Sequence, residues 1–158
     1  MDPDKKQILL ISPRGFCAGV TRAVDVVLET LKKHGSPVYV KHEIVHNKHV
    51  IKDLEQKGTI FIEDVEDVPC DRPLIFSAHG VSKKVINEAK INNSIIIDAT
   101  CPLVTKVHVQ AQKFFKEGFK IILIGHKNHP EVEGTMGQLP EGSILLIEKI
   151  SDIENYNF

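Results

Sequence analysis

Two cysteines lie in turns where a predicted strand passes into a predicted helix, a place from which thiols could bind a metal ion or cluster. Cys17 lies in PRGFCAGV and Cys101 lies in DATCPLVTKVH. The start of a helix presents outward-pointing N–H groups and a positive dipole end, which stabilise the thiolate form that binds metal. A pair of small buried cysteines without a function is the ordinary alternative. Histidines in similar turns favour the metal or cluster site.

Three histidines and a glutamate occupy turns of the same kind, each after a predicted strand. His46 lies in KHEIVHN, His79 in FSAHG, and His129 with Glu131 in GHKNHPEVEGT. Ligands of parallel α/β sheets bind outside the carboxyl ends of the strands. Imidazoles and helix N-termini there can donate hydrogen bonds to phosphate oxygens. Glu131 could donate a proton to a bound substrate, although a glutamate in the first turn of a helix needs no function.

The elements that must position these residues alternate along almost the whole chain, as short apolar runs and amphipathic segments. This order predicts an α/β fold of mostly parallel sheets with flanking helices. Residues 1–101 are expected to form one complete α/β domain, and residues 102–158 part of a second. The predicted strands are 8–12, 38–40, 59–62, 74–77, 94–98, 120–125 and 144–147. The predicted helices are 20–34, 48–56, 83–90, 103–116 and 130–138, and Ser151 is expected to cap one more.

Composition excludes several classes of protein. The 158 residues carry 20 Lys and Arg against 21 Asp and Glu, so no overall charge attracts nucleic acid or an anionic membrane. The N-terminal segment is acidic with only a short apolar run, unlike a signal peptide, and no run reaches the roughly 18 apolar residues of a membrane span. Three cysteines do not make a disulfide framework. A cytoplasmic protein is expected, without nucleic-acid or membrane partners.

Five segments, in their order and spacing, resemble the LytB/IspH family of 4-hydroxy-3-methylbut-2-enyl diphosphate reductases. The resemblance extends from Ile8 to about Ile147, and it rests on PRGFCAGV, HEIVHN, FSAHGVS, DATCPLVTKVH and GHKNHPEVEGTMGQ. It implies a three-domain, trefoil-like fold of similar α/β domains around a central 4Fe–4S cluster. Three cysteines would hold the cluster, and its fourth iron would bind the hydroxyl group of the substrate.

The resemblance also implies a role for each matching residue. Cys17 and Cys101 would be two of the cluster ligands, and Glu131 would protonate the substrate as its hydroxyl leaves as water. The diphosphate would be bound by the histidines His46, His79 and His129. The implied reaction is a reductive dehydroxylation, the last step of the non-mevalonate isoprenoid pathway, which yields isopentenyl and dimethylallyl diphosphates. Its two electrons would come singly through the cluster from a ferredoxin or flavodoxin.

The chain departs from the family pattern because the third cluster cysteine, and further substrate-binding Thr, Ser and Asn residues, are expected beyond its last residue. Cys70 is not expected to replace that cysteine. It lies in the acidic loop EDVEDVPCDRP, where carboxylates disfavour a thiolate, and this loop is predicted to be far from the strand ends. The chain alone is therefore expected to lack turnover. An unfinished second domain is also expected to make it poorly stable and prone to association.

Two other functions remain open at this point. A zinc-dependent phosphate-ester hydrolase could use Cys17, Cys101 and His129 as a three-ligand open site. A non-catalytic module could capture diphosphates through its histidine turns. Metal and sulfide content after anaerobic reconstitution would separate the zinc enzyme from the reductase. Diphosphate binding that is lost on changing His46 or His79 to Ala, with no cluster present, would support the binding module.

Overall fold

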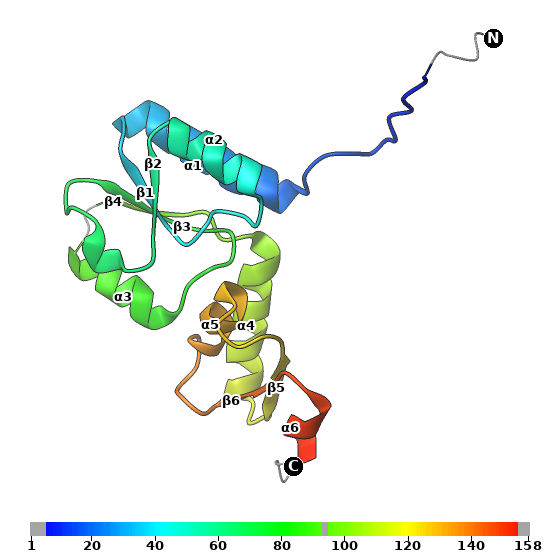
Figure 1. The fold of residues 1–158 in the computed structure, drawn as a ribbon. Coiled ribbons are helices and arrows are strands. Elements are labelled where there is room, and N and C mark those ends of the chain that lie inside the picture. The colour runs from blue at the N-terminus through cyan, green and yellow to red at the C-terminus, as the bar shows by residue number, and fades with distance from the viewer. Residues whose placement is uncertain (1–5, 93–94, 155–158) are drawn as a thin grey trace.

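The structure of the protein, a computed structural model, describes residues 6–92 and 95–154. These residues form an α/β fold with one sheet of order β2-β1-β3-β4 and a second sheet of β5 and β6, parallel throughout (Figure 1). The predicted fold class is therefore confirmed. The strands are β1 (Val38–Lys41), β2 (Thr59–Ile62), β3 (Pro73–Phe76), β4 (Ile95–Asp98), β5 (Ile121–Ile124) and β6 (Ile144–Ile147). The helices are α1 (Ala18–His34), α2 (Lys48–Gln56), the 3-10 turn η1 (Val65–Asp67), α3 (Lys83–Asn92), α4 (Pro102–Lys116), α5 (Pro130–Met136) and α6 (Ile150–Glu154).

Helices cover both faces of the four-stranded sheet (Figure 1). On one face, α1 and α2 pack against the side chains of Val40 and Ile75. On the other face, α3 and η1 pack against Leu74 and Phe76. Strand β3 is buried along its whole length, as expected for a central parallel strand that is covered on both sides. This rigid core fixes where the carboxyl ends of the strands lie.

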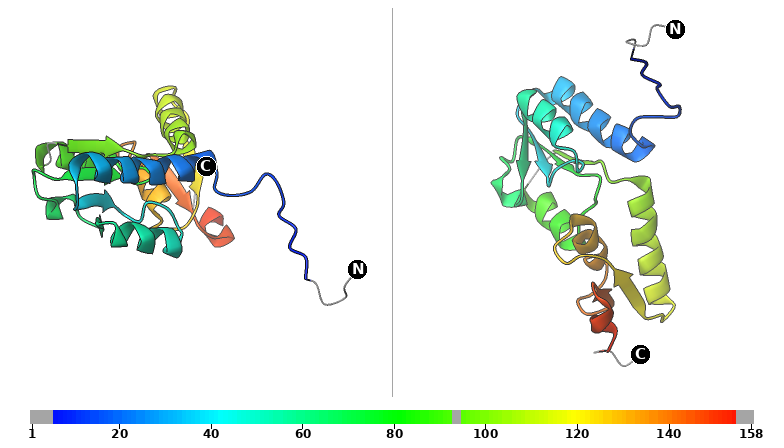
Figure 2. Two further views of the ribbon diagram at one scale, coloured as in Figure 1. Left: turned by 90° about the horizontal axis from the view of Figure 1, so that it is seen from above. Right: turned by 45° about the vertical axis from the view of Figure 1, so that its right-hand side comes forward.

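The second sheet lies beyond α4, which leads away from the four-stranded sheet (Figure 2). Helix α5 connects β5 to β6 and packs against α4, while α6 packs against β6. The division of the chain into two domains at residue 101 stays a prediction. No helix in the described part of the chain is both long and apolar enough to span a membrane.

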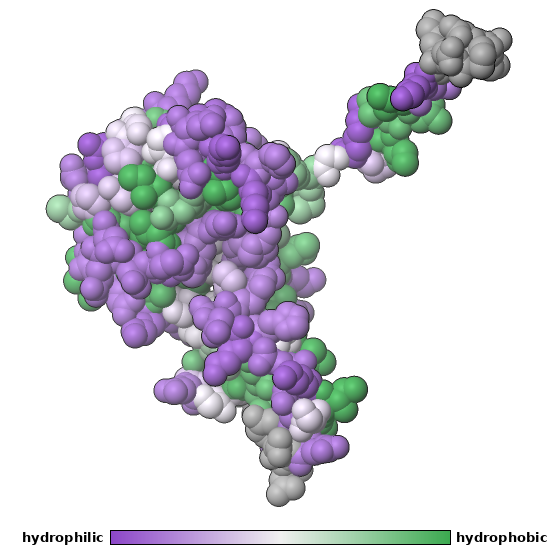
Figure 3. All heavy atoms as spheres, viewed as in Figure 1, coloured by the Kyte–Doolittle hydropathy of each residue, from purple (hydrophilic) through white to green (hydrophobic). Residues whose placement is uncertain are grey.

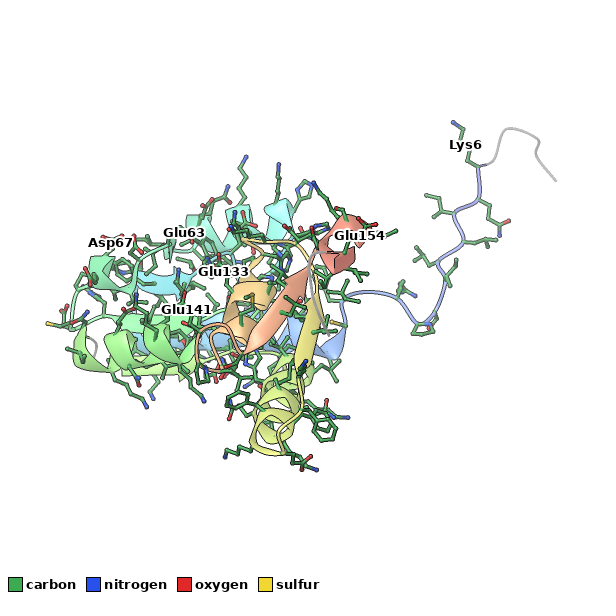
Figure 4. All side chains as sticks on the ribbon, turned by 90° about the horizontal axis from the view of Figure 1, so that it is seen from below. Lys6, Glu63, Asp67, Glu133, Glu141 and Glu154 are labelled. Carbon is green, nitrogen blue, oxygen red and sulfur yellow. The ribbon has the colours of Figure 1, made fainter. Side chains whose placement is uncertain are left out.

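The strand predicted at residues 8–12 does not form, so this prediction is wrong. Residues 6–16 form no helix or strand and lead away from the body, as the position of Lys6 shows (Figure 4). The apolar side chains of Ile8–Ile11 are 69% to 84% exposed. An apolar run becomes a strand only where another strand pairs with its backbone groups, and none of the described strands does so. The first sheet consequently has four strands instead of five.

The prediction for the last helix is also corrected. Ser151 lies inside α6, which begins at Ile150. The carboxylate of Asp152 accepts hydrogen bonds from the backbone N–H groups of Glu148 and Lys149, both at 2.9 Å, and so takes the capping role. In the predicted strand 94–98, Ser94 lies outside the described residues, and the remainder forms β4.

Candidate functional site

The backbone ladder of the main sheet continues past the strand ends and aligns three turns. The N–H of Ala78, just beyond β3, donates to the carbonyl of Ile44 at 3.3 Å. The carbonyl of Ala78 accepts from the N–H of Cys101 at 3.0 Å. These bonds place the loop of His46, the turn of His79 and the start of α4 side by side. Of the five strand ends expected to carry site residues, these three lie at one edge of the main sheet.

The two cysteines each occupy the N-cap position of a long helix. Cys17 precedes α1 and Cys101 precedes α4, and neither thiol makes a capping hydrogen bond. A β-carbon at Gly19 would lie 2.7 Å from Sγ of Cys101 and 3.9 Å from Sγ of Cys17. Both sulfurs therefore lie beside the same residue of α1, in space that any larger side chain would fill.

Arg22 holds the two cysteine turns together. Its guanidinium donates from Nη1 to the carbonyl of Thr100 at 2.9 Å and from Nη2 to the carbonyl of Asp98 at 3.3 Å. Arg22 lies in α1, which begins after Cys17, and Thr100 directly precedes Cys101. A planar guanidinium that bonds two carbonyls restricts both distance and orientation. The relative position of the thiols thus depends on a contact between elements far apart in the sequence.

The three histidines form a compact group. The ring centroids lie 4.3 Å apart for His46 and His79, 5.2 Å for His46 and His129, and 6.1 Å for His79 and His129. His79 is only 4% exposed, and its Nδ1 shares a hydrogen bond of 3.2 Å with Oγ of Ser77. The loops after β1, β3 and β5 thus bring one imidazole each to the same point.

The pKa of His79 is lowered to about 4, mainly by burial and in addition by the neighbouring charges of His46, His129 and His42, whereas a hydrogen bond with the backbone of Glu43 acts in the opposite direction. Imidazoles this close repel one another when they are protonated. An anion placed among them would remove that repulsion and accept their N–H groups. The group therefore suits a ligand with several negative charges.

A fourth histidine, His42, lies near this group and contacts a carboxylate. Nδ1 of His42 lies 2.6 Å from Oε2 of Glu63, and Glu133 of α5 raises the pKa of His42 through its negative charge. Burial has the larger effect, so the pKa of His42 is lowered on balance. Figure 4 labels Glu63, which follows β2, and Glu133 on α5. His42 is thus paired with Glu63, while Glu133 acts on it only through its charge.

A cavity of about 560 Å³ brings five of the six predicted site residues together. Much of its remaining wall is apolar, including Phe16, Val45 and Leu103. The predicted residues that line it are Cys17, His46, His79, Cys101 and Glu131. The sixth, His129, reaches the same place through its ring contacts with His46 and His79. Such a cavity can hold an organic ligand with an apolar part and a charged end.

Glu131 and His129 are held at the start of α5. His129 is the N-cap residue, Pro130 is the first helical residue, and Nδ1 of His129 accepts the backbone N–H of Glu131 at 3.2 Å. This bond orients the imidazole and leaves its Nε2 for another partner. The carboxylate of Glu131 is exposed at the cavity, where it can meet a bound molecule.

Cys70 lies at the opposite edge of the sheet. It is exposed in the loop before β3, whereas the site lies beyond the ends of the strands. The neighbouring Arg72 donates from Nη1 to the carbonyl of Ser36, a residue that precedes β1, at 3.4 Å. In the described part of the chain, no three His, Cys, Asp or Glu side chains are arranged to hold one metal ion. This geometry disfavours the zinc site of Cys17, Cys101 and His129.

Several residues of the site were not identified by sequence reasoning. Asn47 caps α2 by accepting the backbone N–H groups of His49 and Val50 at 3.1 and 3.2 Å, which fixes the residue after His46. An asparagine before an amphipathic segment is a local signal that could have revealed this cap. Arg22, Ser77 and the space at Gly19 give no local signal, because their partners become neighbours only in the folded chain.

The fold and the site together define an α/β protein whose parallel strands end at paired thiols and grouped imidazoles. The family model described as LytB protein matches residues 8–157, and the chain belongs to this family. Curated relatives include two proteins named 4-hydroxy-3-methylbut-2-enyl diphosphate reductase. The one from Hyphomonas neptunium is 62% identical over 90% of this chain, and the one from Paracoccus denitrificans is 57% identical over 95%. The chain spans about half the length of these relatives, at 45% and 48%.

Two solved structures have the same fold over most of the chain. The E-1-hydroxy-2-methyl-but-2-enyl-4-diphosphate reductase from Plasmodium falciparum superimposes with a TM-score of 0.88 at 52% identity, covering 93% of this chain and 46% of that one. A structure of (E)-4-hydroxy-3-methyl-but-2-enyl diphosphate reductase, described as the terminal enzyme of the non-mevalonate pathway, gives a TM-score of 0.80 at 34% identity. It covers 94% of this chain and 53% of that one.

Proposed function

We propose that this chain is the part of a 4-hydroxy-3-methylbut-2-enyl diphosphate reductase that binds the substrate diphosphate and provides two thiolate ligands to a 4Fe–4S cluster. The reaction would be the last step of the non-mevalonate pathway, in the cytoplasm, with a ferredoxin or flavodoxin as electron donor. The names of the relatives support the reaction class. The observation that carries the proposal is the group of three imidazoles beside a cavity lined by both cysteines.

The diphosphate would bind at His46, His79 and His129. Each ring comes from a different loop, so a ligand among them contacts the turns beyond three strands at once. The low pKa of His79, caused mainly by burial, keeps that ring neutral until an anion arrives. Binding would then take up protons, because each nearby phosphate charge raises the affinity of the rings for a proton. The apolar wall of the cavity suits the hydrocarbon part of the substrate.

The thiols of Cys17 and Cys101 fit a shared inorganic group. Both sulfurs lie beside Gly19, whose missing side chain leaves the space between them open. Soft thiolate ligands are those that iron–sulfur clusters use. When bound, the cluster would supply single electrons to the substrate. No third thiol of the described residues lies at this edge of the sheet.

Glu131 would supply a proton from the start of α5. In the overall change, the carbon–oxygen bond of the substrate hydroxyl breaks and that oxygen leaves as water. The remaining allylic fragment gains two electrons from the donor and one proton. A second proton converts the departing hydroxyl to water, and Glu131 is the acid we assign to this transfer. Its exposure at the cavity wall allows the carboxyl to be protonated again from solvent.

Calorimetric titration of the chain with inorganic pyrophosphate tests the diphosphate site. We expect binding that His79→Gln or His46→Gln weakens about tenfold or more, as for lost hydrogen bonds to charged groups. His34→Gln is the matched control, because His34 ends α1 at the opposite end from the site. Failure of the unaltered chain to bind pyrophosphate, or an equal effect of all three substitutions, contradicts the proposal.

Anaerobic reconstitution with iron, sulfide and an added small thiol tests the cysteine assignment. We expect iron uptake, followed by visible absorption and electron paramagnetic resonance, that Cys17→Ser or Cys101→Ser abolishes and Cys70→Ser leaves unchanged. Uptake that depends on Cys70 contradicts the assignment, and so does the absence of any uptake. Pyrophosphate binding without iron uptake would instead indicate a diphosphate-binding module.

A further inference from the structure

Both polar atoms of the Gln138 side chain form hydrogen bonds, and these bonds join three parts of the chain. It follows α5 and is only 5% exposed. Its Nε2 donates to the carbonyls of Val81 and Gly134, both at 2.8 Å, and its Oε1 accepts from Nε2 of Gln112 at 3.1 Å. Val81 comes two residues after His79, Gly134 lies in α5, and Gln112 lies in α4. One buried side chain therefore bonds to the segment after His79 and to two helices that begin at site residues.

Glycines bring α5 directly against the same segment. A β-carbon at Gly134 would lie 3.2 Å from the carbonyl oxygen of Gly80, and one at Gly137 would overlap Ser82. The carbonyl of Gly137 also accepts the backbone N–H of Lys83 at 3.1 Å. The second half of α5 and the glycine that follows it thus contact residues 80–83, and the motif EGTMGQ contains the residues that make these contacts.

This contact decides where the first residues of α5 lie. His129 caps the helix and Glu131 lies in its first turn, while the ring of His129 meets the rings of His46 and His79. His79 directly precedes the segment to which Gln138 bonds. The segment after His79, the side chain of Gln138 and α5 therefore form one connected path between the His79 and His129 rings.

We propose that Gln138 is a positioning residue, which fixes His129 and Glu131 relative to His79 for the diphosphate and proton-transfer roles given above. The inference rests on the proposed function for its purpose, but its geometry can be tested without any ligand. Removing the amide leaves the carbonyl of Val81 and the amide of Gln112 without this partner, and unpaired buried polar groups favour a shifted packing of α5.

Two matched substitutions of the chain separate positioning from simple stabilisation. Gln138→Met removes all three bonds with little change in length, whereas Gln112→Met removes only the bond to Oε1. Nuclear magnetic resonance of the imidazoles reports the proximity of the His79 and His129 rings and the titration of His79. We expect Gln138→Met to weaken the ring contact and to raise the pKa of His79 from about 4 towards 6.5. The His79 ring would be less buried and farther from His129, and both changes favour its protonated form. Gln112→Met should change both signals much less, because the bonds of Gln138 to Val81 and Gly134 remain.

Pyrophosphate titration of the same variants completes the test. We expect Gln138→Met to weaken binding about tenfold and Gln112→Met to leave it within twofold. If Gln138→Met loses stability but keeps the ring contact, the His79 titration and the pyrophosphate affinity, the positioning role is overturned. If the unaltered chain binds no pyrophosphate while Gln138→Met still separates the rings, the positioning role stands and the proposed function fails.

A second variant applies if Gln138→Met does not fold. Gln138→Glu keeps the shape, and burial holds its carboxyl in the protonated form, which can donate one hydrogen bond instead of two. We expect a weaker ring contact and a lower pyrophosphate affinity than in the unaltered chain, because one of the two donated bonds is lost. Values for Gln138→Glu that equal those of the unaltered chain would contradict the proposal.

Discussion

The guanidinium of Arg22 donates a hydrogen bond of 2.9 Å to the carbonyl of Thr100, and this bond joins the helix that follows Cys17 to the turn that contains Cys101. The two cysteines belong to different elements, and this bond is one of the contacts that determine how far apart they lie. A single exposed side chain therefore contributes to the geometry of the thiol pair.

Replacing Arg22 should separate the thiols without unfolding the chain. Arg22→Met keeps most of the apolar stem but removes both bonds to the carbonyls of Thr100 and Asp98. In a Cys70→Ser background, a short bifunctional thiol reagent should cross-link Cys17 to Cys101 several-fold less efficiently. Arg72→Met, at the opposite edge of the sheet, is the control. Equal cross-linking in both variants would contradict the role of Arg22.

A methyl group at Gly19 should disturb the thiol pair and spare the helix. Gly19→Ala would place a β-carbon 2.7 Å from Sγ of Cys101, so the thiol must rotate away. The helix itself should gain up to about 1 kcal/mol, because alanine is the better helix former. We expect less iron uptake on reconstitution together with an unchanged or higher urea midpoint. Asp25→Ala, on the exposed side of α1, should leave iron uptake as it is.

Stability should fall as the pH is lowered from about 6.5 to about 4. The pKa of His79 is about 4 in the folded chain, below the ordinary value of 6.5, so the unfolded chain binds this proton more readily in that range. The resulting stability is complete above pH 6.5 and is lost as the pH falls through 4. Urea midpoints measured between pH 7 and pH 4 should show the slope.

Substitution of His79 identifies the source of that slope. His79→Gln should reduce it, while His34→Gln should leave it unchanged. A remaining slope of the same sign is expected from His42 and His108, because burial also lowers their pKa values. A full slope in His79→Gln would show that the buried imidazole of the site is not the main cause.

The chain should associate as its concentration rises. Apolar side chains are exposed over the N-terminal segment and along α4 and β5, and they form patches on the surface (Figure 3). On α4 and β5 they include Leu103, Val107, Val109, Phe114, Phe115, Ile122 and Ile124. Patches of this kind favour self-association in water. Sedimentation velocity over a hundredfold range of concentration should show it, and a monomer with sharp, reversible unfolding throughout would contradict the prediction.

Local patterns were sufficient to predict the regular elements. The apolar spacing of Ala23 and Val27, followed by Gly35, identifies α1. Of the helices and strands whose limits were predicted, those that formed end within two residues of these limits. The strand predicted at residues 8–12 does not form, because an apolar segment becomes a strand only when a partner strand is present. The backbone of one segment contains no information about that partner.

The site was predictable where its residues act at strand ends and unpredictable where they act through contacts. His46, His79 and Cys101 follow strands of one parallel sheet, so topology alone brings them to one edge. Cys17 and His129 join them only through contacts made in the folded chain. Gln138 and Arg22 have no such position. Their importance arises from bonds to Val81 and Thr100, which no periodicity or turn signal encodes.

Four helices begin at residues of the site, and at two of these starts, Cys17 and Cys101, the side chain makes no capping hydrogen bond. The carbonyls of Cys17, Asn47, Cys101 and His129 accept the first bonds of α1, α2, α4 and α5, each at 3.0 Å. At Cys17 and Cys101 the folded architecture therefore uses only the main chain, and the thiols are free for chemistry. The side chains at these two positions can therefore be substituted or chemically labelled with little effect on folding.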